Sequence, residues 1–281
     1  MKRRDFLKYT APAAILPTLI NGFSIKAFAS SPMLNALSAA PDNDHVLVMI
    51  QMTGGNDGLN MVIPLDMYGK YQAARSNIAI QEGKVLRLDN YLKAGLHPSM
   101  TGIQQLYSEG KVSIVQSVGY PSPNFSHFRA TDIWLTGSDS DQVLTTGWGG
   151  RYLSTQYDGF PDGYPNADNP DPLAIQIGSI VSPAFQGPNA SMGIAITSAT
   201  DFYNLINGVT DPVPNTKWGK ELEYIRLIAK QTNSNEKSIK EAAAKVSSQG
   251  AYPANNGLAE QLKIVARLVA GGLKTRLYMV T

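Results

Sequence analysis

The feature that most constrains the fold is a continuous apolar run at residues 46–52, followed at once by the glycine-rich segment TGGNDGLN. The run has no helical period, which is typical of a strand buried on both faces of a parallel sheet. A glycine-rich loop directly after such a strand lies at the carboxyl end of the sheet, where doubly wound folds bind ligands. The sequence therefore predicts an α/β protein with a candidate site in this loop.

The following segments alternate between helix and strand patterns. Residues 64–75 and 98–109 favour helices, and residues 85–89 favour an edge or connecting strand. Residues 111–118 predict a second central strand, and after a turn Ser126 stands at the N-cap position of another helix. This order is typical of a doubly wound, mostly parallel sheet with helices on both faces.

The second half of the chain continues this alternation. Residues 173–177 and 192–196 predict further strands, and residues 258–270 predict a helix with one apolar stripe. A final strand is expected at residues 275–281. Because the chain stops within that strand, we expect residues 45–281 to be the N-terminal part of a longer α/β domain.

Two segments fall outside the alternation. Residues 216–250 predict a helical insertion, in which Glu236/Lys240 and Glu241/Lys245 are favourable pairs on a solvated face. Residues 157–172 are rich in proline and aspartate and predict an ordered loop. Calcium binding is the alternative for this loop, although it lacks the ligand spacing of an EF-hand.

The N-terminus has the pattern of a signal peptide. A basic segment, KRRDFLK, precedes a mildly apolar stretch and a small-x-small motif that ends at Ala29. The paired arginines resemble a twin-arginine signal, which predicts cleavage after Ala29 and export through the twin-arginine translocase to the periplasm or bacterial cell surface. Prolines and Lys26 interrupt the apolar stretch, so residues 1–29 do not predict a membrane span. Residues 30–44 predict an exposed lead-in.

Composition excludes several kinds of site. The chain has no cysteine, which excludes disulfides, thiolate zinc sites and a cysteine nucleophile. Its 3 histidines limit any imidazole chemistry. Residues 1–29 hold five basic residues and one acidic residue, so the rest of the chain carries 2 − 4 = −2 of the net charge of +2. Without a basic stripe, nucleic-acid binding is not expected.

Two short segments hold the main candidates for chemistry. Asp57 lies in the glycine-rich loop and is a candidate metal ligand, with simple turn formation as the alternative. Ser126 lies at a helix start, where the dipole and free N–H groups favour an anion or a nucleophile; a simple N-cap is the alternative. His127 and Asn124 are its candidate neighbours.

Two further residues, Arg129 and His97, are weaker candidates, and His45 is discarded. Arg129 could contact an oxyanion in bidentate fashion or pair with Asp132. His97 precedes a predicted helix, whereas His45 opens the first strand at the opposite end from the site. A triad of Ser126, His97 and Asp57 is not expected, because the chain has no G-x-S-x-G elbow.

Four segments together carry a resemblance to a known family: QMTGGNDGLNMVIP (residues 51–64), GLHPSM (95–100), VGYPSPNFSHFRATDIWLTG (118–137) and GWGGRYL (147–153). From about residue 46 to its last residue, the chain resembles the bacterial family catalogued as domain of unknown function 1501. That family looks like a branch of the alkaline phosphatase and sulfatase superfamily. The resemblance implies a parallel sheet that presents two metal ions and a helix-capping nucleophile.

Carried over by residue, the resemblance makes Asp57 the metal ligand and Ser126 the nucleophile. It implies divalent metal ions as cofactors, with further ligands beyond residue 281, and a small anionic ester as substrate. We therefore expect an exported metal-dependent hydrolase of phosphate or sulfate esters whose site is incomplete in this chain. The alternative is a non-catalytic exported protein that binds an anionic ligand or a cell-surface partner with the same fold.

Overall fold

The structure is a computed structural model that describes residues 45–199, 216 and 234–281. The predicted signal peptide, its cleavage site after Ala29 and the lead-in lie outside the described residues, as do residues 217–233 of the predicted insertion. Residues 48–281 form one compact unit, and only residues 45–47 of the preceding unit are described.

A four-stranded parallel sheet confirms the α/β class. Residue Ile175 lies opposite Ile194 on one neighbouring strand and opposite Tyr278 on the other, and both pairings are parallel. At the far strand, the Gln51 N–H donates to the Val280 carbonyl at 2.9 Å. In spatial order the strands are β1 (Leu47–Ile50), β7 (Leu277–Val280), β5 (Ala174–Ile177) and β6 (Ile194–Ile196).

The strands at the centre of this sheet are the most deeply buried part of the chain. Every residue of β5 and β7 is buried, because both strands have a neighbour on each side and packed side chains on each face. The predicted strand at residues 275–281 is therefore confirmed. The first apolar run is also a strand, but the expected burial on both faces is wrong: β1 is an end strand of the described sheet, and Ile50 is 45% exposed.

The prediction of a central strand at residues 111–118 is wrong. This segment is irregular, and Val115 and Val118 are 76% and 80% exposed. Strand propensity expresses how well side chains fit a paired, half-buried surface. Among the described residues nothing pairs with this segment, so its strand-forming composition has no sheet to join.

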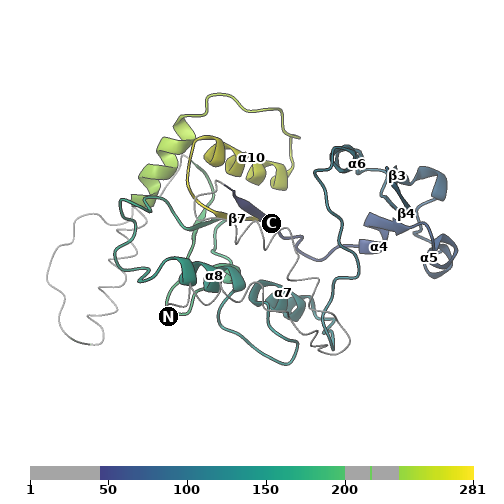
Figure 1. The fold of residues 1–281 in the computed structure, drawn as a ribbon, viewed down its shortest axis with the longest axis horizontal. Helices are drawn as coiled ribbons and strands as arrows, with labels where there is room; N and C mark the ends of the chain where they lie inside the picture. The colour runs from purple at the N-terminus through teal and green to yellow at the C-terminus, as the bar shows by residue number, and fades with distance from the viewer. Residues whose placement is uncertain (1–44, 200–215, 217–233) are drawn as a thin grey trace, which may run out of the picture. The chain divides into compact units, whose positions relative to one another are not determined.

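The segment after the glycine-rich loop belongs to a second, antiparallel sheet. Its strands are β2 (Val62–Pro64), β4 (Tyr91–Leu96) and β3 (Leu86–Leu88), with β4 in the middle. Helices α4 (Gly58–Met61), α5 (Tyr68–Ala74) and α6 (Thr101–Ser108) pack beside these strands (Figure 1). The predictions of a strand at residues 85–89 and of helices within 64–75 and 98–109 are confirmed; β2 and β4 were not predicted.

Close backbone contact explains a glycine in β4. A Cβ atom built on Gly95 would lie 2.3 Å from Val85 Cγ1 and 2.8 Å from the Leu86 carbonyl oxygen. Such distances are far inside van der Waals contact, so only glycine fits without movement. The neighbouring core of this sheet centres on Ile63 and Tyr71, which are buried together with Val85.

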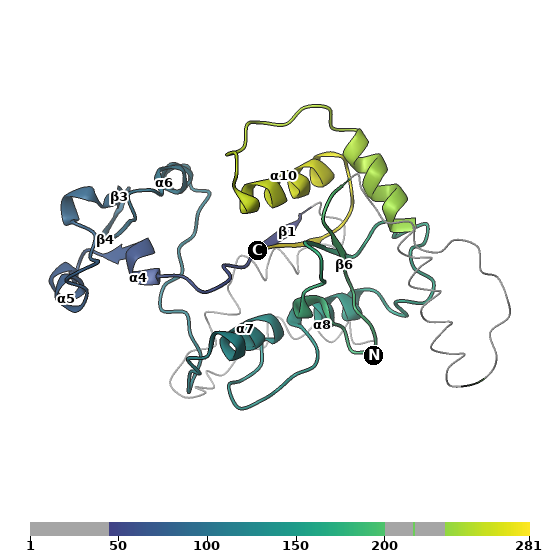
Figure 2. The same cartoon turned by 180° about the vertical axis from the view of Figure 1, so that it is seen from behind.

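Three longer helices belong to the part of the chain that holds the parallel sheet. Helix α10 (Gly257–Ala270) confirms its prediction and packs on β7 and β5, and Asn256 caps it by accepting from the Ala259 N–H at 3.0 Å. Helices α7 (His127–Thr136) and α8 (Trp148–Gln156) pack on the short 3-10 helix η2 (Pro183–Phe185). In Figures 1 and 2, α10 lies on one side of β7 and α8 on the other.

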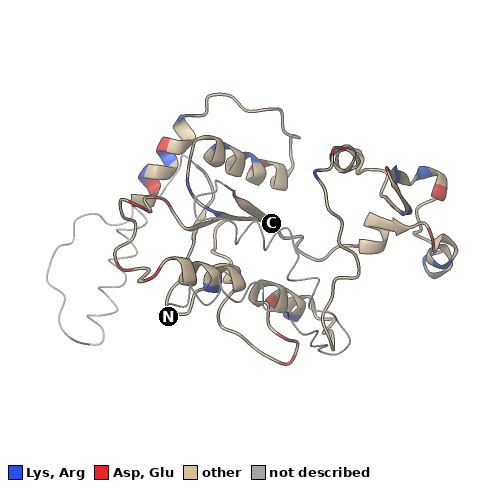
Figure 3. Cartoon of the chain, in the orientation of Figure 1, with Lys and Arg blue, Asp and Glu red and all other residues tan. Residues whose placement is uncertain are grey.

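The described end of the predicted insertion is helical over residues 234–244. Lys240 pairs with Glu236 at 2.5 Å, as predicted. Glu241 lies 3.9 Å from Lys237 and does not pair with Lys245, because Lys245 lies in the turn after the helix. These charges appear as alternating colours along this helix in Figure 3. Residues 157–172 form an ordered loop of turns, as predicted. In the described part of the chain, no helix has the length and apolar character needed to cross a membrane.

Candidate functional site

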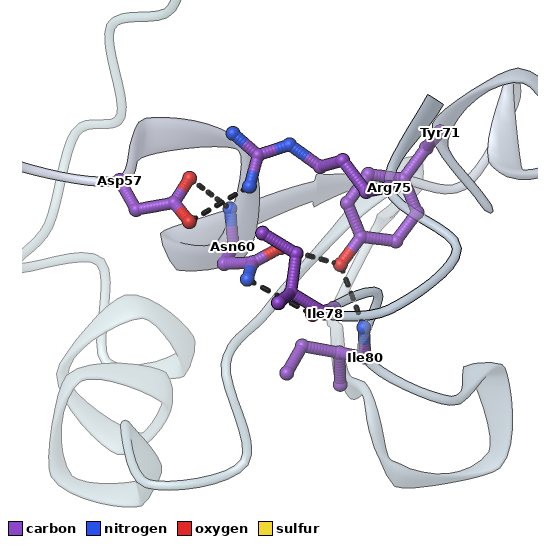
Figure 4. A network of polar contacts seen from close by, with 6 residues as sticks. All are labelled: Asp57, Asn60, Tyr71, Arg75, Ile78 and Ile80. Atoms are coloured by element: carbon purple, nitrogen blue, oxygen red, sulfur yellow. Dashed lines mark hydrogen bonds and ion pairs between the residues drawn. The ribbon is translucent and has the colours of Figure 1, made fainter. Parts of the chain in front are cut away.

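The glycine-rich loop ends at Asp57, which caps the short helix α4. One carboxylate oxygen, Oδ1, accepts from the Asn60 N–H at 3.3 Å, and the other, Oδ2, receives Arg75 Nη1 at 2.7 Å (Figure 4). The hydrogen bond from Arg75 is the main reason that the pKa of Asp57 is held below its ordinary value. Asp57 is therefore a carboxylate with one fixed cationic partner.

A chain of hydrogen bonds ties this loop to α5 and to the segment after it. The Tyr71 hydroxyl donates to Asn60 Oδ1 at 2.7 Å and accepts from the Ile80 N–H at 2.7 Å. The Asn60 side chain also donates to the Ile78 carbonyl at 3.1 Å. Because Tyr71 is buried, its hydroxyl holds both partners in a fixed geometry (Figure 4).

The described residues do not by themselves fit a two-metal site. Each ion of such a site needs several oxygen or nitrogen ligands, and Oδ2 of Asp57 already receives a guanidinium. Within residues 45–199 and 234–281, no group of three or more His, Asp or Glu side chains is placed to hold a metal ion. A metal-dependent mechanism would need further ligands from outside these residues.

The start of α7 presents Ser126 differently from a conventional N-cap. Its backbone is extended, as expected at this position, but its hydroxyl makes no capping hydrogen bond. Instead, the Ser126 N–H donates to Asn124 Oδ1 at 2.8 Å, and the Asn124 N–H donates to the Tyr120 hydroxyl at 3.3 Å. The preceding turn is thus fixed by side chains while the Ser126 hydroxyl stays available.

The glycine-rich loop and the start of α7 meet at Gly55. Gly55 has a positive φ of 94°, and a Cβ built on it would lie 3.8 Å from His127 Cε1 and 3.9 Å from Nδ1. Glycine adopts this backbone conformation easily, and the two distances show that the imidazole lies within van der Waals reach of the loop. The structure therefore brings two of the predicted segments, the loop after β1 and the Ser126/His127 helix start, to one place.

The other side of the loop faces His97. Asp57 and His97 both line an open hollow of about 360 Å³, together with Asn60, Met61 and Met100. The ring nitrogen Nδ1 of His97 accepts from the Ser99 N–H at 3.2 Å, which leaves Nε2 as the nitrogen that can face a ligand. Asp57 and His97 are thus neighbours of one hollow, while no hydrogen bond in the described chain joins them.

One nitrogen of the Arg129 guanidinium holds the segment that follows its own helix. Its Nη2 donates to the carbonyl oxygens of Asp139 and Ser140 at 3.2 Å each, and also to that of Gln142. These bonds close the segment after α7 onto the helix, and the alternative pairing with Asp132 is not among the ion pairs formed. These bonds use Nη2 alone, and Nε and Nη1 take no part in them, so the oxyanion contact of Arg129 stays a prediction.

Sequence reasoning missed the residues that organise Asp57. Asn60 belongs to the glycine-rich segment itself, whereas Tyr71 lies in α5 and Arg75 at its end, and nothing in the spacing of these two links them to Asp57. Only the pattern N-D-G-L-N, in which Asn60 follows the capping aspartate by three residues, offered a local signal.

Comparison with known proteins adds no further assignment, since no family model, curated protein or solved structure matches the chain.

Replacing Arg75 by Gln should raise the pKa of Asp57 toward its ordinary value, because the main cause of the lowered pKa is removed. Since the folded-state pKa lies below the unfolded-state value, the stabilisation by this pair is present above the unfolded pKa and is lost as the pH falls through the folded pKa. Carboxylate-detected NMR titration of the wild type and of Arg75→Gln measures the shift.

The internal control for this titration is Glu109, whose pKa is lowered mainly by Lys111 and should not move in Arg75→Gln. An unchanged Asp57 pKa would show that the pair in Figure 4 does not form in solution.

Proposed function

We propose that the protein is an exported metal-dependent hydrolase of phosphate or sulfate esters, with an alkaline phosphatase-like, doubly wound fold and the family membership that its four segments suggest. Asp57 would be one metal ligand, and the others would come from outside the described residues. Export would follow the twin-arginine route to the periplasm or cell surface. The observation that supports this proposal most directly is the meeting of Gly55 with His127, which places the loop after β1 beside a helix start with an available serine hydroxyl.

The chemistry follows from the groups at this place. The first N–H groups of α7 point out of the helix and, with its dipole, favour an anionic ester. Ser126 Oγ would attack phosphorus or sulfur and form a new ester bond, while the bond from that atom to the substrate's alcohol oxygen breaks. The departing oxygen would take up the serine proton and leave as the alcohol. Water would then hydrolyse the intermediate and restore the serine. The glycines at positions 54 and 55 add no side chains of their own beside this helix start.

A second candidate is non-catalytic binding of an anionic ligand or a cell-surface partner. The Asp57–Arg75 ion pair favours this reading, because it neutralises the one carboxylate that the hydrolase proposal assigns to a metal. Binding at the start of α7 would need neither Asp57 nor a metal ion. The two candidates therefore differ in whether Asp57 matters.

The decisive assay measures release of 4-nitrophenol from its phosphate and sulfate esters, with added divalent metal and after chelation. If the hydrolase proposal holds, chelation should abolish turnover, and Asp57→Asn should reduce it by roughly tenfold to 100-fold. The matched control is Asp66→Asn, which removes an exposed carboxylate outside the network in Figure 4. No turnover of either ester, with inorganic phosphate still binding, would favour the second candidate.

A further inference from the structure

A second hollow, of about 200 Å³, lies at the end of α8, apart from the loop after β1. Its walls come from two segments, the turn that follows α8 and the tight turn at residues 187–190. The side chains that line it combine two aromatic rings, a thioether and three polar groups: Tyr157, Phe160, Met192, Ser154, Asp158 and Asn189.

The two walls are held rigidly against each other by close backbone packing. A Cβ built on Gly150 of α8 would lie 2.3 Å from the backbone of Gln186. On the other wall, the Gly187 N–H donates to the Ala190 carbonyl at 2.9 Å, and a Cβ on Gly187 would lie 2.8 Å from Met192 Cγ. A concave site with fixed walls needs little ordering when a ligand binds.

The aromatic wall is supported from behind. Tyr164 packs edge-on against Tyr157 with ring centroids 6.2 Å apart, and tilted against Phe160 at 5.5 Å. These contacts orient both lining rings. Burial also raises the pKa of Tyr157, so its hydroxyl stays protonated and able to donate at neutral pH.

The polar side chains of the hollow come from both walls, Asp158 from the turn after α8 and Asn189 from the turn at residues 187–190. Asp158 and Asn189 are exposed, and their side chains make no hydrogen bond within the described residues. Ser154 Oγ donates to the Arg151 carbonyl at 2.8 Å and keeps its lone pairs for a ligand donor. The hollow thus offers a carboxylate acceptor and an amide with both donor and acceptor atoms.

We propose that this hollow binds one pyranose ring of a neutral saccharide. An aromatic ring suits the apolar C–H face of a sugar ring, and a carboxylate and an amide that line the same hollow suit its hydroxyl groups, each of which both donates and accepts. No lysine or arginine lines the hollow, which disfavours anions. A quaternary ammonium ion would use the rings and Asp158 but has no use for Asn189.

The test is calorimetric titration of the full chain with methyl glycosides of glucose, galactose, mannose and N-acetylglucosamine. At least one glycoside should bind saturably, with Asp158→Asn weakening it about tenfold or more, since a charge-assisted bond is lost. The matched control, Asp162→Asn, changes a carboxylate of the same loop that does not line the hollow and should leave binding unchanged.

Tetramethylammonium serves as the competing probe. Saturable binding of this cation with no glycoside binding would overturn the saccharide assignment, as would equal effects of Asp158→Asn and Asp162→Asn. Absence of binding of every glycoside at concentrations up to about 50 mM would also overturn it, because even weak sugar sites saturate well below that concentration. None of these three outcomes bears on ester hydrolysis at Ser126.

Discussion

Gly150→Ala is expected to lower the free energy of unfolding by about 3 kcal/mol. The added methyl would meet the backbone of Gln186 at 2.3 Å and Gly187 N at 2.6 Å. Backbone atoms cannot move aside as the end of a flexible side chain can, so α8 would have to shift away from η2. The shift would also disturb the rigid walls of the proposed saccharide hollow.

The matched control is Gly102→Ala in α6. Gly102 is also helical, but a Cβ there would meet nothing within 4 Å. Alanine at this place should therefore stabilise the protein, by up to about 1 kcal/mol from helix propensity. Urea unfolding followed by circular dichroism measures both variants, and equal changes in the two would contradict the packing of α8 on η2.

Ser126→Ala is expected to reduce ester hydrolysis by roughly 10³-fold or more, because the variant lacks the attacking oxygen. Its free energy of unfolding should change by less than about 0.5 kcal/mol, since the hydroxyl makes no capping hydrogen bond. A working N-cap would instead cost about 1 kcal/mol on removal. Kinetics with 4-nitrophenyl esters and urea unfolding together separate the two roles.

The control for this variant is Ser113→Ala, an exposed serine in the irregular segment after α6. It should affect neither turnover nor stability. A stability loss of about 1 kcal/mol in Ser126→Ala, with turnover intact, would identify Ser126 as an ordinary helix cap and remove it from the chemistry.

The elements that were predicted correctly are those whose sequence signal lies within the element itself. The apolar runs of β1, β5 and β7 and the single apolar stripe of α10 can each be recognised without knowing what the element packs against. The failure at residues 111–118 has the opposite cause: the segment has the composition of a strand, but pairing depends on a neighbour elsewhere in the chain. The missed β2 and β4 are short strands that pair with each other.

For the candidate site, the positions of the residues could be predicted from sequence, whereas their partners could not. Ser126 at a helix start and Asp57 in a loop after β1 follow from local pattern, and the structure places both there. The partners of these residues do not follow from pattern. Arg75 binds Asp57, which lies 18 residues earlier in the chain, and Arg129 donates to carbonyl oxygens beyond its own helix. Tertiary packing decides which partners lie within reach of these side chains.

On the function proposed above, an anionic ester binds where the glycine-rich loop meets the start of α7. The most direct measurement follows amide and imidazole NMR signals while inorganic phosphate is titrated into the protein. We predict saturable shifts of Gly55, Ser126 and His127, with signals around the hollow at the end of α8 unchanged. Shifts confined to other residues, or none at these three, would contradict the proposed site.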